Sequence, residues 1–299
     1  MLFPCHSLKL VALLLIGAGA ILHVPQAGEA SPLQLQSLLP AKTGASNSHR
    51  TQSAGPTAVQ LPIDVVALPP LSNPFGASYG TWGARWWQWA VSAPFGADPI
   101  TDLDGTYCDY GQGGPVWYLA GSFGGTTVRS CTVPAGAAIF FPIVNFYANY
   151  PCPPEFGFEP APGQTVEEFL TEFVTTAIDG ATNMVVEVDG VSMGDVTPFR
   201  GTSTLFMLDF DPSWAAADPC VISEPQPTVS DGYWMMLTPL TPGNHTLYFH
   251  AELPNFGGFT VDVTYNLTVL PGARGRGSIA NAPRAAESAT WGLVKQLYK

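Results

Sequence analysis

The residues best suited to chemistry lie in one acidic, glycine-rich stretch, ADPITDLDGTYCDYGQGGP at 97–115. Its aspartates are Asp98, Asp102, Asp104 and Asp109. Calcium takes oxygen ligands from several carboxylates and carbonyls, and a curled loop can supply both. The stretch lacks the spacing and the closing glutamate of an EF-hand. It therefore predicts either a calcium site, with no other cofactor, or a turn-rich loop held by Cys108.

A tryptophan-rich stretch, YGTWGARWWQWA at 79–90, is the second candidate for ligand contact. Its four tryptophans could stack on a sugar or another flat partner, or they could form the buried side of a helix. At helical spacing Trp82, Trp86 and Trp89 share one face, and Trp87 lies at the edge of that face. The predicted ligand-binding residues are Trp87, Arg85, Gln88, Gln112 and Trp117.

The sequence holds no HExxH motif and no Cys/His cluster, which disfavours zinc or copper chemistry. His245 and His250 lie five apart on one expected strand, so they point to opposite faces and cannot chelate one metal unless the strand is bulged. The stretch AGSFG at 120–124 approximates a serine-hydrolase elbow, but a strand follows where an elbow needs a helix. Without these motifs, a protein that is not an enzyme is favoured, and the question stays open.

Paired carboxylates keep a second class of function open. Glycoside hydrolysis needs two acids, one on each side of the scissile bond. Glu187 and Asp189 share one face of an expected strand and its turn, and so do Asp209 and Asp211. Solvated turn acids are the alternative interpretation of all four.

The charge distribution excludes some partners. The chain has 23 acidic and 11 basic residues and a net charge of −12. Between residues 51 and 271 the basic residues are Arg85, Arg129 and Arg200. A region this acidic repels the phosphate backbone of nucleic acid, which is therefore an unsuitable partner. Arg85 and Arg129 are expected to pair with a carboxylate or to bind an anionic ligand.

The ends of the chain differ in composition from its middle. Residues 1–30 carry Lys9, an apolar run from Leu10 to Leu22 and then small residues, which is the layout of a secretory signal peptide. The apolar run is too short for a membrane-spanning helix. Residues 31–60 are expected to form a flexible leader, 61–271 one domain, and 272–299 a basic tail. The mature chain is therefore expected to be secreted, without a transmembrane segment.

Four cysteines follow the signal peptide: Cys108, Cys131, Cys152 and Cys220. In an exported chain an even number of cysteines favours disulfides over metal or redox chemistry. Three pairings are possible. Cys108–Cys131 with Cys152–Cys220 is preferred, because the first two cysteines flank one hairpin-like unit.

The elements that must position these residues are mostly strands. Helices are expected near 78–93, with Ser78 as N-cap, and at 165–179. Short β-branched and aromatic segments separated by Gly/Pro turns predict strands. These are expected at 116–122, 126–133, 138–145, 183–188, 191–193, 204–210, 232–238, 245–252 and 259–269. The fold class is all-β with two helices: an antiparallel, disulfide-stapled β-sandwich of jelly-roll or Ig-like type.

Several phrases together resemble a family of exported, mostly bacterial proteins of unknown function. They are YGTWGARWWQWA, GQGGPVWYLAGSFGG, CTVPAGAAIFFPIVN, VEVDGV, SDGYWMMLTPLTPGNHTLYF and FTVDVTYNLTV, and they span about residues 74–269. The resemblance implies a shared fold and supplies no catalytic residues. The ending SATWGLVKQLYK resembles short tails of other exported bacterial proteins, which implies a sorting or anchoring tag; an irregular helical terminus is the alternative.

Three functions are compatible with these patterns. The first is an exported or cell-envelope protein, not an enzyme, that binds a ligand or partner such as a glycan. The second is a carbohydrate-active hydrolase with paired carboxylates. The third is a structural component of the envelope. The missing catalytic motifs favour the first.

Overall fold

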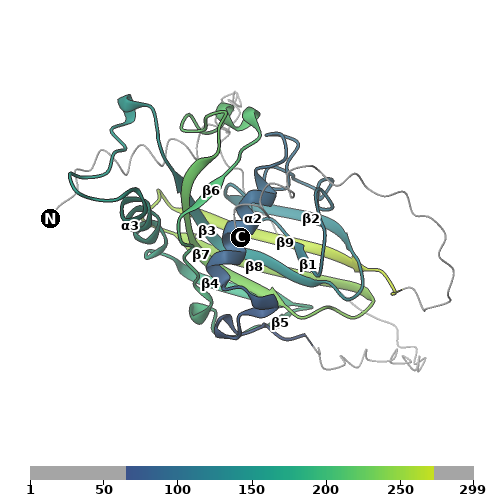
Figure 1. Cartoon of the computed structure of the whole chain (residues 1–299). Helices are drawn as coiled ribbons and strands as arrows, with labels where there is room; N and C mark the ends of the chain where they lie inside the picture. The colour runs from purple at the N-terminus through teal and green to yellow at the C-terminus, as the bar shows by residue number, and fades with distance from the viewer. Residues whose placement is uncertain (1–64, 273–299) are drawn as a thin grey trace, which may run out of the picture.

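The computed structural model describes residues 65–272, so the predicted signal peptide, leader and tail lie outside the described residues. The described chain forms two β-sheets and two α-helices, which confirms the expectation of a β-rich fold with two helices (Figure 1). The helices are α2 (Tyr79–Ala90) and α3 (Val166–Ile178). The strands are β1 (Val116–Tyr118), β2 (Gly125–Val133), β3 (Ala138–Asn149), β4 (Thr182–Val188), β5 (Val191–Ser192), β6 (Phe206–Leu208), β7 (Gln226–Leu237), β8 (Gly243–Leu253) and β9 (Phe259–Val269).

The strands form a four-stranded sheet, β1-β3-β7-β6, and a five-stranded sheet, β2-β9-β8-β4-β5. Pairs β1·β3 and β2·β9 are parallel, and the other pairs are antiparallel. The expectation of a purely antiparallel arrangement is therefore wrong. The reason is that β2 crosses to the other sheet between β1 and β3, so β3 returns beside β1 in the same direction.

Strand β3 lies in the middle of the core and is covered on both faces. Ile139 and Phe141 pack in one cluster with Phe249 and other residues of the five-stranded sheet. Phe140 packs in a second cluster with the tryptophans of α2. Burial on both faces explains why AIFFPIVN is apolar throughout instead of alternating.

A β-bulge changes which side chains of β3 face α2. The register with β7 shifts between Pro142 and Val144, which places one extra residue in β3. Before the shift Phe140 packs in the α2 cluster, and after it Tyr147 does. The positions that face α2 thus change from even to odd numbers, so Asn145 shares a face with Tyr147.

Helix α2 lies close to the four-stranded sheet because of its N-cap and its glycines. The Ser78 hydroxyl accepts a hydrogen bond from the Thr81 amide at 3.2 Å, as expected of an N-cap. A Cβ atom on Gly83 would lie 2.7 Å from the ring of Trp234 in β7. A glycine is therefore required for this close approach.

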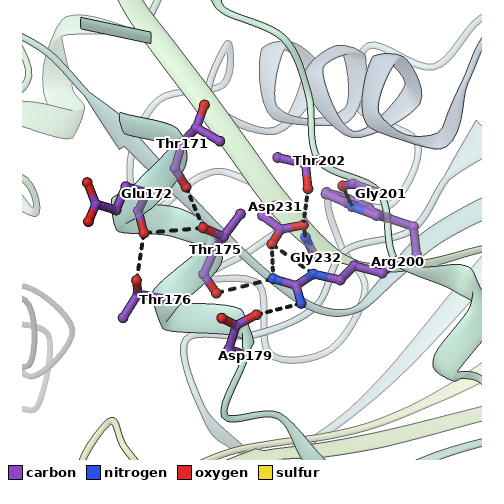
Figure 2. A network of polar contacts seen from close by, with 11 residues as sticks. Thr171, Glu172, Thr175, Thr176, Asp179, Arg200, Gly201, Thr202, Asp231 and Gly232 are labelled. Carbon is purple, nitrogen blue, oxygen red and sulfur yellow. Dashed lines mark hydrogen bonds and ion pairs between the residues drawn. The ribbon is translucent and has the colours of Figure 1, made fainter. Parts of the chain in front are cut away.

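Helix α3 is held at one end of β3 and β7 by apolar packing and by Arg200 (Figure 2). Arg200 Nη2 lies 2.6 Å from Asp231 of β7, and Nη1 lies 2.6 Å from Asp179 at the C-terminus of α3. Arg200 also donates to the Thr175 carbonyl at 3.1 Å. The Asp231 side chain is fully buried, and these carboxylates raise the pKa of Arg200. The network fastens α3 to the sheet.

Both predicted disulfides are present, Cys108–Cys131 and Cys152–Cys220. Each joins segments far apart in the chain, with separations of 23 and 68 residues. The first ties the acidic stretch to β2, and the second ties the segment after β3 to the segment before β7.

Candidate functional site

The four tryptophans of α2 are buried, which excludes an exposed aromatic platform on this helix. The indole N–H groups of Trp82, Trp86 and Trp89 donate to the carbonyls of Pro74, Leu119 and Tyr110. Trp87 differs. Its side chain is as buried as the others, at 4 % exposed, although the helical spacing placed it at the edge. Its buried Nε1 has no hydrogen-bond partner among residues 65–272.

The structure does not bring the other predicted ligand-binding residues together with Trp87. The exposed Arg85 lies over the Trp82 ring, 4.6 Å from its centroid. Gln88 is exposed and donates to the Met207 carbonyl at 2.6 Å. Gln112 bonds to the backbone of Cys108 and Tyr118 and so holds its own loop. Trp117 lies on β1, away from α2's buried face.

The aspartates of 97–115 mostly bind the backbone of their own loop. Asp98 is fully buried and accepts from the amides of Gly96, Ile100 and Thr101. Asp102, also buried, accepts from three amides, those of Asp104, Gly105 and Tyr107. Asp104 and Asp109 are exposed, and hydrogen bonds from Thr106 lower the pKa of Asp104.

Within residues 65–272 no group of three or more His, Cys, Asp or Glu side chains is arranged to hold a metal ion. The calcium site stays a prediction.

Arg129 organises the same loop from β2, a role that the sequence did not indicate. Its guanidinium is buried and donates to the carbonyls of Ile100, Asp102, Ala120 and Gly121 and to the Tyr265 hydroxyl. The expected carboxylate partner is not among these acceptors. Arg129 thus positions the loop that carries Asp102 and the segment after β1.

A polar cleft of about 880 Å³, which we call the Trp117 cleft, lies at one end of the five-stranded sheet. Its lining includes two rows of polar residues in register. Ser130, Asn266 and Thr246 are neighbours across β2, β9 and β8, and Thr132, Thr268 and Asn244 form the next row. Trp117 also lines the cleft, from the inner side of the sheet where it packs against the core, and its buried Nε1 has no partner among residues 65–272.

The charged groups of the Trp117 cleft are carboxylates and one histidine. Asp109 and Asp189 both line it, and among residues 65–272 no Lys or Arg lines it. Asp189 accepts from the Thr246 amide at 2.7 Å, and its other oxygen lies 2.7 Å from His245 Nδ1. His250 lies farther along β8, on the opposite face from His245 and near Glu252 and Asp262, so the two histidines occupy different sites as expected.

A second, smaller space of about 140 Å³, which we call the aromatic cavity, lies between α2, β3 and the loops beside them. Trp87 and Tyr147 line it with ring centroids 4.4 Å apart. Asn145 also lines it, and its buried Nδ2 has no partner. Other rings in its wall are those of Trp86, Phe123, Phe146, Phe156, Phe158, Phe173, Trp214 and Phe259.

One carboxylate, that of Asp218, borders the aromatic cavity. It accepts from the Tyr147 hydroxyl at 2.9 Å and from the Cys220 amide at 2.8 Å. Burial raises the pKa of Asp218, and burial together with this carboxylate raises the pKa of Tyr147. No sequence signal marks Asn145, Tyr147 or Asp218, because the β3 bulge and the loop that carries Asp218 bring them together.

No protein-family model matches this chain, and neither a curated protein nor a solved structure is similar to it. The resemblance to exported bacterial proteins is thus a prediction. Among residues 65–272 no helix is long and apolar enough to cross a membrane.

Proposed function

We propose that this protein is an exported or cell-envelope binding protein, without catalytic activity, and that it holds a neutral saccharide in the Trp117 cleft. The observation that carries the proposal is the pair of polar rows that line this cleft on the outer face of the five-stranded sheet, with Trp117 in the lining on the inner side of the same end of the sheet. Hydroxyl and amide side chains both donate and accept hydrogen bonds, as sugar hydroxyls do. A tryptophan adds an apolar ring with a polar N–H.

The charges support a neutral ligand over an anionic one. Asp109 and Asp189 line the cleft, and within residues 65–272 no Lys or Arg lies in its lining to offset them. The whole chain carries a net charge of −12, so an anionic saccharide would be repelled both locally and at long range. Neutral hydroxyls face no such repulsion.

A carbohydrate-active hydrolase is the second candidate, because two carboxylates line the same cleft as Trp117. We favour binding, since both oxygens of Asp189 are engaged by Thr246 and His245. A general acid or nucleophile must instead present an oxygen to the glycosidic bond.

Export is supported by the two disulfides, which persist in oxidising compartments. Two sheets that share one core support the proposal of a sandwich related to jelly-roll or Ig-like domains. A purely structural role in the envelope is the remaining alternative, and saccharide binding separates the two.

The test uses cellobiose, maltose and lactose as probes, with isothermal titration calorimetry of the full chain. We expect saturable binding of at least one, weakened about tenfold by Asn266→Ala, since one hydrogen bond contributes about 1 kcal/mol. Thr132→Ala should also weaken binding. Thr126→Ala is the matched control, because Thr126 is an exposed threonine on the same face of β2 outside the cleft.

Failure of all three disaccharides to bind, or equal effects of Thr132→Ala and Thr126→Ala, would contradict the saccharide proposal. Release of monosaccharides from a bound disaccharide, abolished by Asp109→Asn, would establish the hydrolase instead.

A further inference from the structure

We infer that the aromatic cavity is a separate binding site for a neutral aromatic molecule of about one ring that carries a carbonyl or other hydrogen-bond acceptor. The inference does not depend on the Trp117 cleft. The two spaces share none of their lining residues.

The volume of the cavity sets the size of the ligand. Its roughly 140 Å³ is close to that of an engineered apolar cavity of about 150 Å³ that binds benzene. Here the walls are mainly aromatic rings, which favour offset or edge-to-face contact with another ring. A single substituted ring therefore fits the space.

Two buried donors set the chemistry of the ligand. Trp87 Nε1 and Asn145 Nδ2 are buried without hydrogen-bond partners in the part of the chain that the structure describes, and both residues line this cavity. An unsatisfied buried donor costs about 1–3 kcal/mol, so two at one cavity need an explanation. The neighbouring Trp82, Trp86 and Trp89 each donate their indole N–H to a carbonyl, so a position on this helix does not by itself leave an indole N–H without a partner.

The geometry places the two donors near one another. The Trp87 ring packs against Tyr147, and Asn145 lies two residues before Tyr147 on the same face of β3. A ligand oxygen in the cavity can accept from these groups, with its ring against the aromatic wall. The site thus combines an apolar wall with a few placed polar groups, as small-molecule sites usually do.

The Asp218 carboxylate disfavours an anionic ligand and has little capacity left to accept a hydrogen bond from a ligand donor. Its oxygens already accept from the Tyr147 hydroxyl and the Cys220 amide. A ligand carboxylate would lie beside this group in a partly buried setting, where charge repulsion is strong. A ketone, aldehyde or ester carbonyl carries no negative charge to be repelled by Asp218 and can accept hydrogen bonds from Trp87 and Asn145.

The residues at the rim indicate where a ligand enters. Gly157 lines the cavity and is exposed, and Ser122 and Phe156, which also line it, are partly exposed. The deep end is formed by the buried Trp86, Trp87 and Trp214. The ring is therefore expected to enter from the loop that contains Gly157.

The test compares acetophenone, which has a carbonyl acceptor, with ethylbenzene, which has a similar shape and none, and with the anion benzoate. Binding to the full chain is measured by ligand-observed NMR and by the unfolding midpoint, which a ligand specific to the folded state must raise. We expect acetophenone to bind at least about tenfold more tightly than ethylbenzene and benzoate, the preference that about one good hydrogen bond gives.

Two variants locate the site. Asn145→Leu and Trp87→Phe each remove one donor and keep an apolar side chain, and we expect each to reduce the preference for acetophenone over ethylbenzene several-fold. The ratio of the affinities for acetophenone and ethylbenzene is compared because a change in cavity size affects both of these similarly shaped ligands. Asn266→Ala, in the Trp117 cleft, is the matched control and should leave the ratio unchanged.

Equal affinities for acetophenone and ethylbenzene in the wild type would overturn the inference, as would a preference that survives both variants. If Trp87→Phe does not fold, Asn145→Leu alone decides the outcome. Loss of saccharide binding in Asn266→Ala with an intact acetophenone preference would separate failure of the proposed function from failure of this inference.

Discussion

At the scale of single residues, Arg129 shows how a buried charge is stabilised without a carboxylate partner. Its guanidinium reaches four backbone carbonyls on two segments of chain and one hydroxyl. The Tyr265 hydroxyl that accepts from it also donates to the Ala120 carbonyl, which extends the network. These carbonyls belong to loop backbone and accept no backbone hydrogen bond from a strand within residues 65–272, so the Arg129 guanidinium supplies donors for them.

We expect Arg129→Lys to lower the free energy of unfolding by at least about 3 kcal/mol, because it leaves several buried carbonyls unpaired. A lysine offers one compact ammonium with three donors and cannot reach both segments as the guanidinium fork does. Urea unfolding followed by fluorescence measures the change. Arg85→Lys is the exposed control, expected within about 0.5 kcal/mol of wild type. Equal small effects of the two substitutions would contradict this account.

Asp218 predicts a pH dependence of stability. Burial raises its pKa in the folded chain, so its stabilising contribution is complete below the unfolded pKa and is lost as the pH rises through the folded pKa. Asp218→Asn removes this loss. We therefore expect the variant to gain stability relative to wild type as the pH rises above the ordinary carboxyl range of about 4.

Urea unfolding of wild type and Asp218→Asn at a series of pH values gives this difference directly, and the other carboxylates cancel in it. Asp211→Asn, the same substitution at the aspartate that caps Pro212–Ala216, is the control. A difference between Asp218→Asn and wild type that is independent of pH, or that falls with rising pH, would refute the prediction.

At the scale of elements, local patterns in the sequence account for most of the boundaries. Ser78 and Thr165 each cap the helix that was expected after them. Asp189 and Gly190 have φ values of 52° and 74°, which make the two-residue hairpin that their types favour. In these cases the signal lies within a few residues of the feature.

The remaining features depend on contacts distant in the chain. The parallel pairing of β1 with β3 follows from where β2 goes, and no residue within β1 encodes it. The candidate sites show the same limit. Trp87 and Trp117 were both predicted to contact ligand, but they line different spaces, and Asn145 joins Trp87 only because a bulge in β3 changes the face.

Helix α2 provides a prediction about packing. Gly83→Ala would be favoured in an isolated helix, by about 1 kcal/mol. In the folded chain the added Cβ would lie 2.7 Å from the Trp234 ring, which is buried and stacked on Phe140. We expect net destabilisation of about 1–3 kcal/mol, because overpacking a filled core outweighs propensity.

The thermal unfolding midpoint of Gly83→Ala measures this balance. Thr81→Ala, at an exposed position of the same helix, is the control and should change stability much less. A raised midpoint for Gly83→Ala would show that helix propensity prevails and that the helix can move away from β7.

At the scale of the whole molecule, each disulfide borders one of the two candidate sites. Cys108 and Cys131 line the Trp117 cleft, and Cys152 and Cys220 line the aromatic cavity. Each bond therefore holds a loop in the wall of its own site. A chain-entropy estimate gives stabilisation of about 3 kcal/mol for the shorter loop and about 4 kcal/mol for the longer one.

We expect the two double variants to separate the sites. Cys152→Ala/Cys220→Ala should lose more stability and should weaken acetophenone binding, because the segment that carries Asp218 and Trp214 is no longer tied to the end of β3. Cys108→Ala/Cys131→Ala should weaken saccharide binding and leave the preference for acetophenone over ethylbenzene intact. Urea unfolding measures the stability of each double variant. The two binding assays, run below the unfolding transition, measure saccharide affinity and the preference for acetophenone over ethylbenzene for each. Equal loss of saccharide binding and of acetophenone binding in both variants would mean that the disulfides act only through global stability. A disulfide that holds a loop locally must affect the adjacent site more than the distant one.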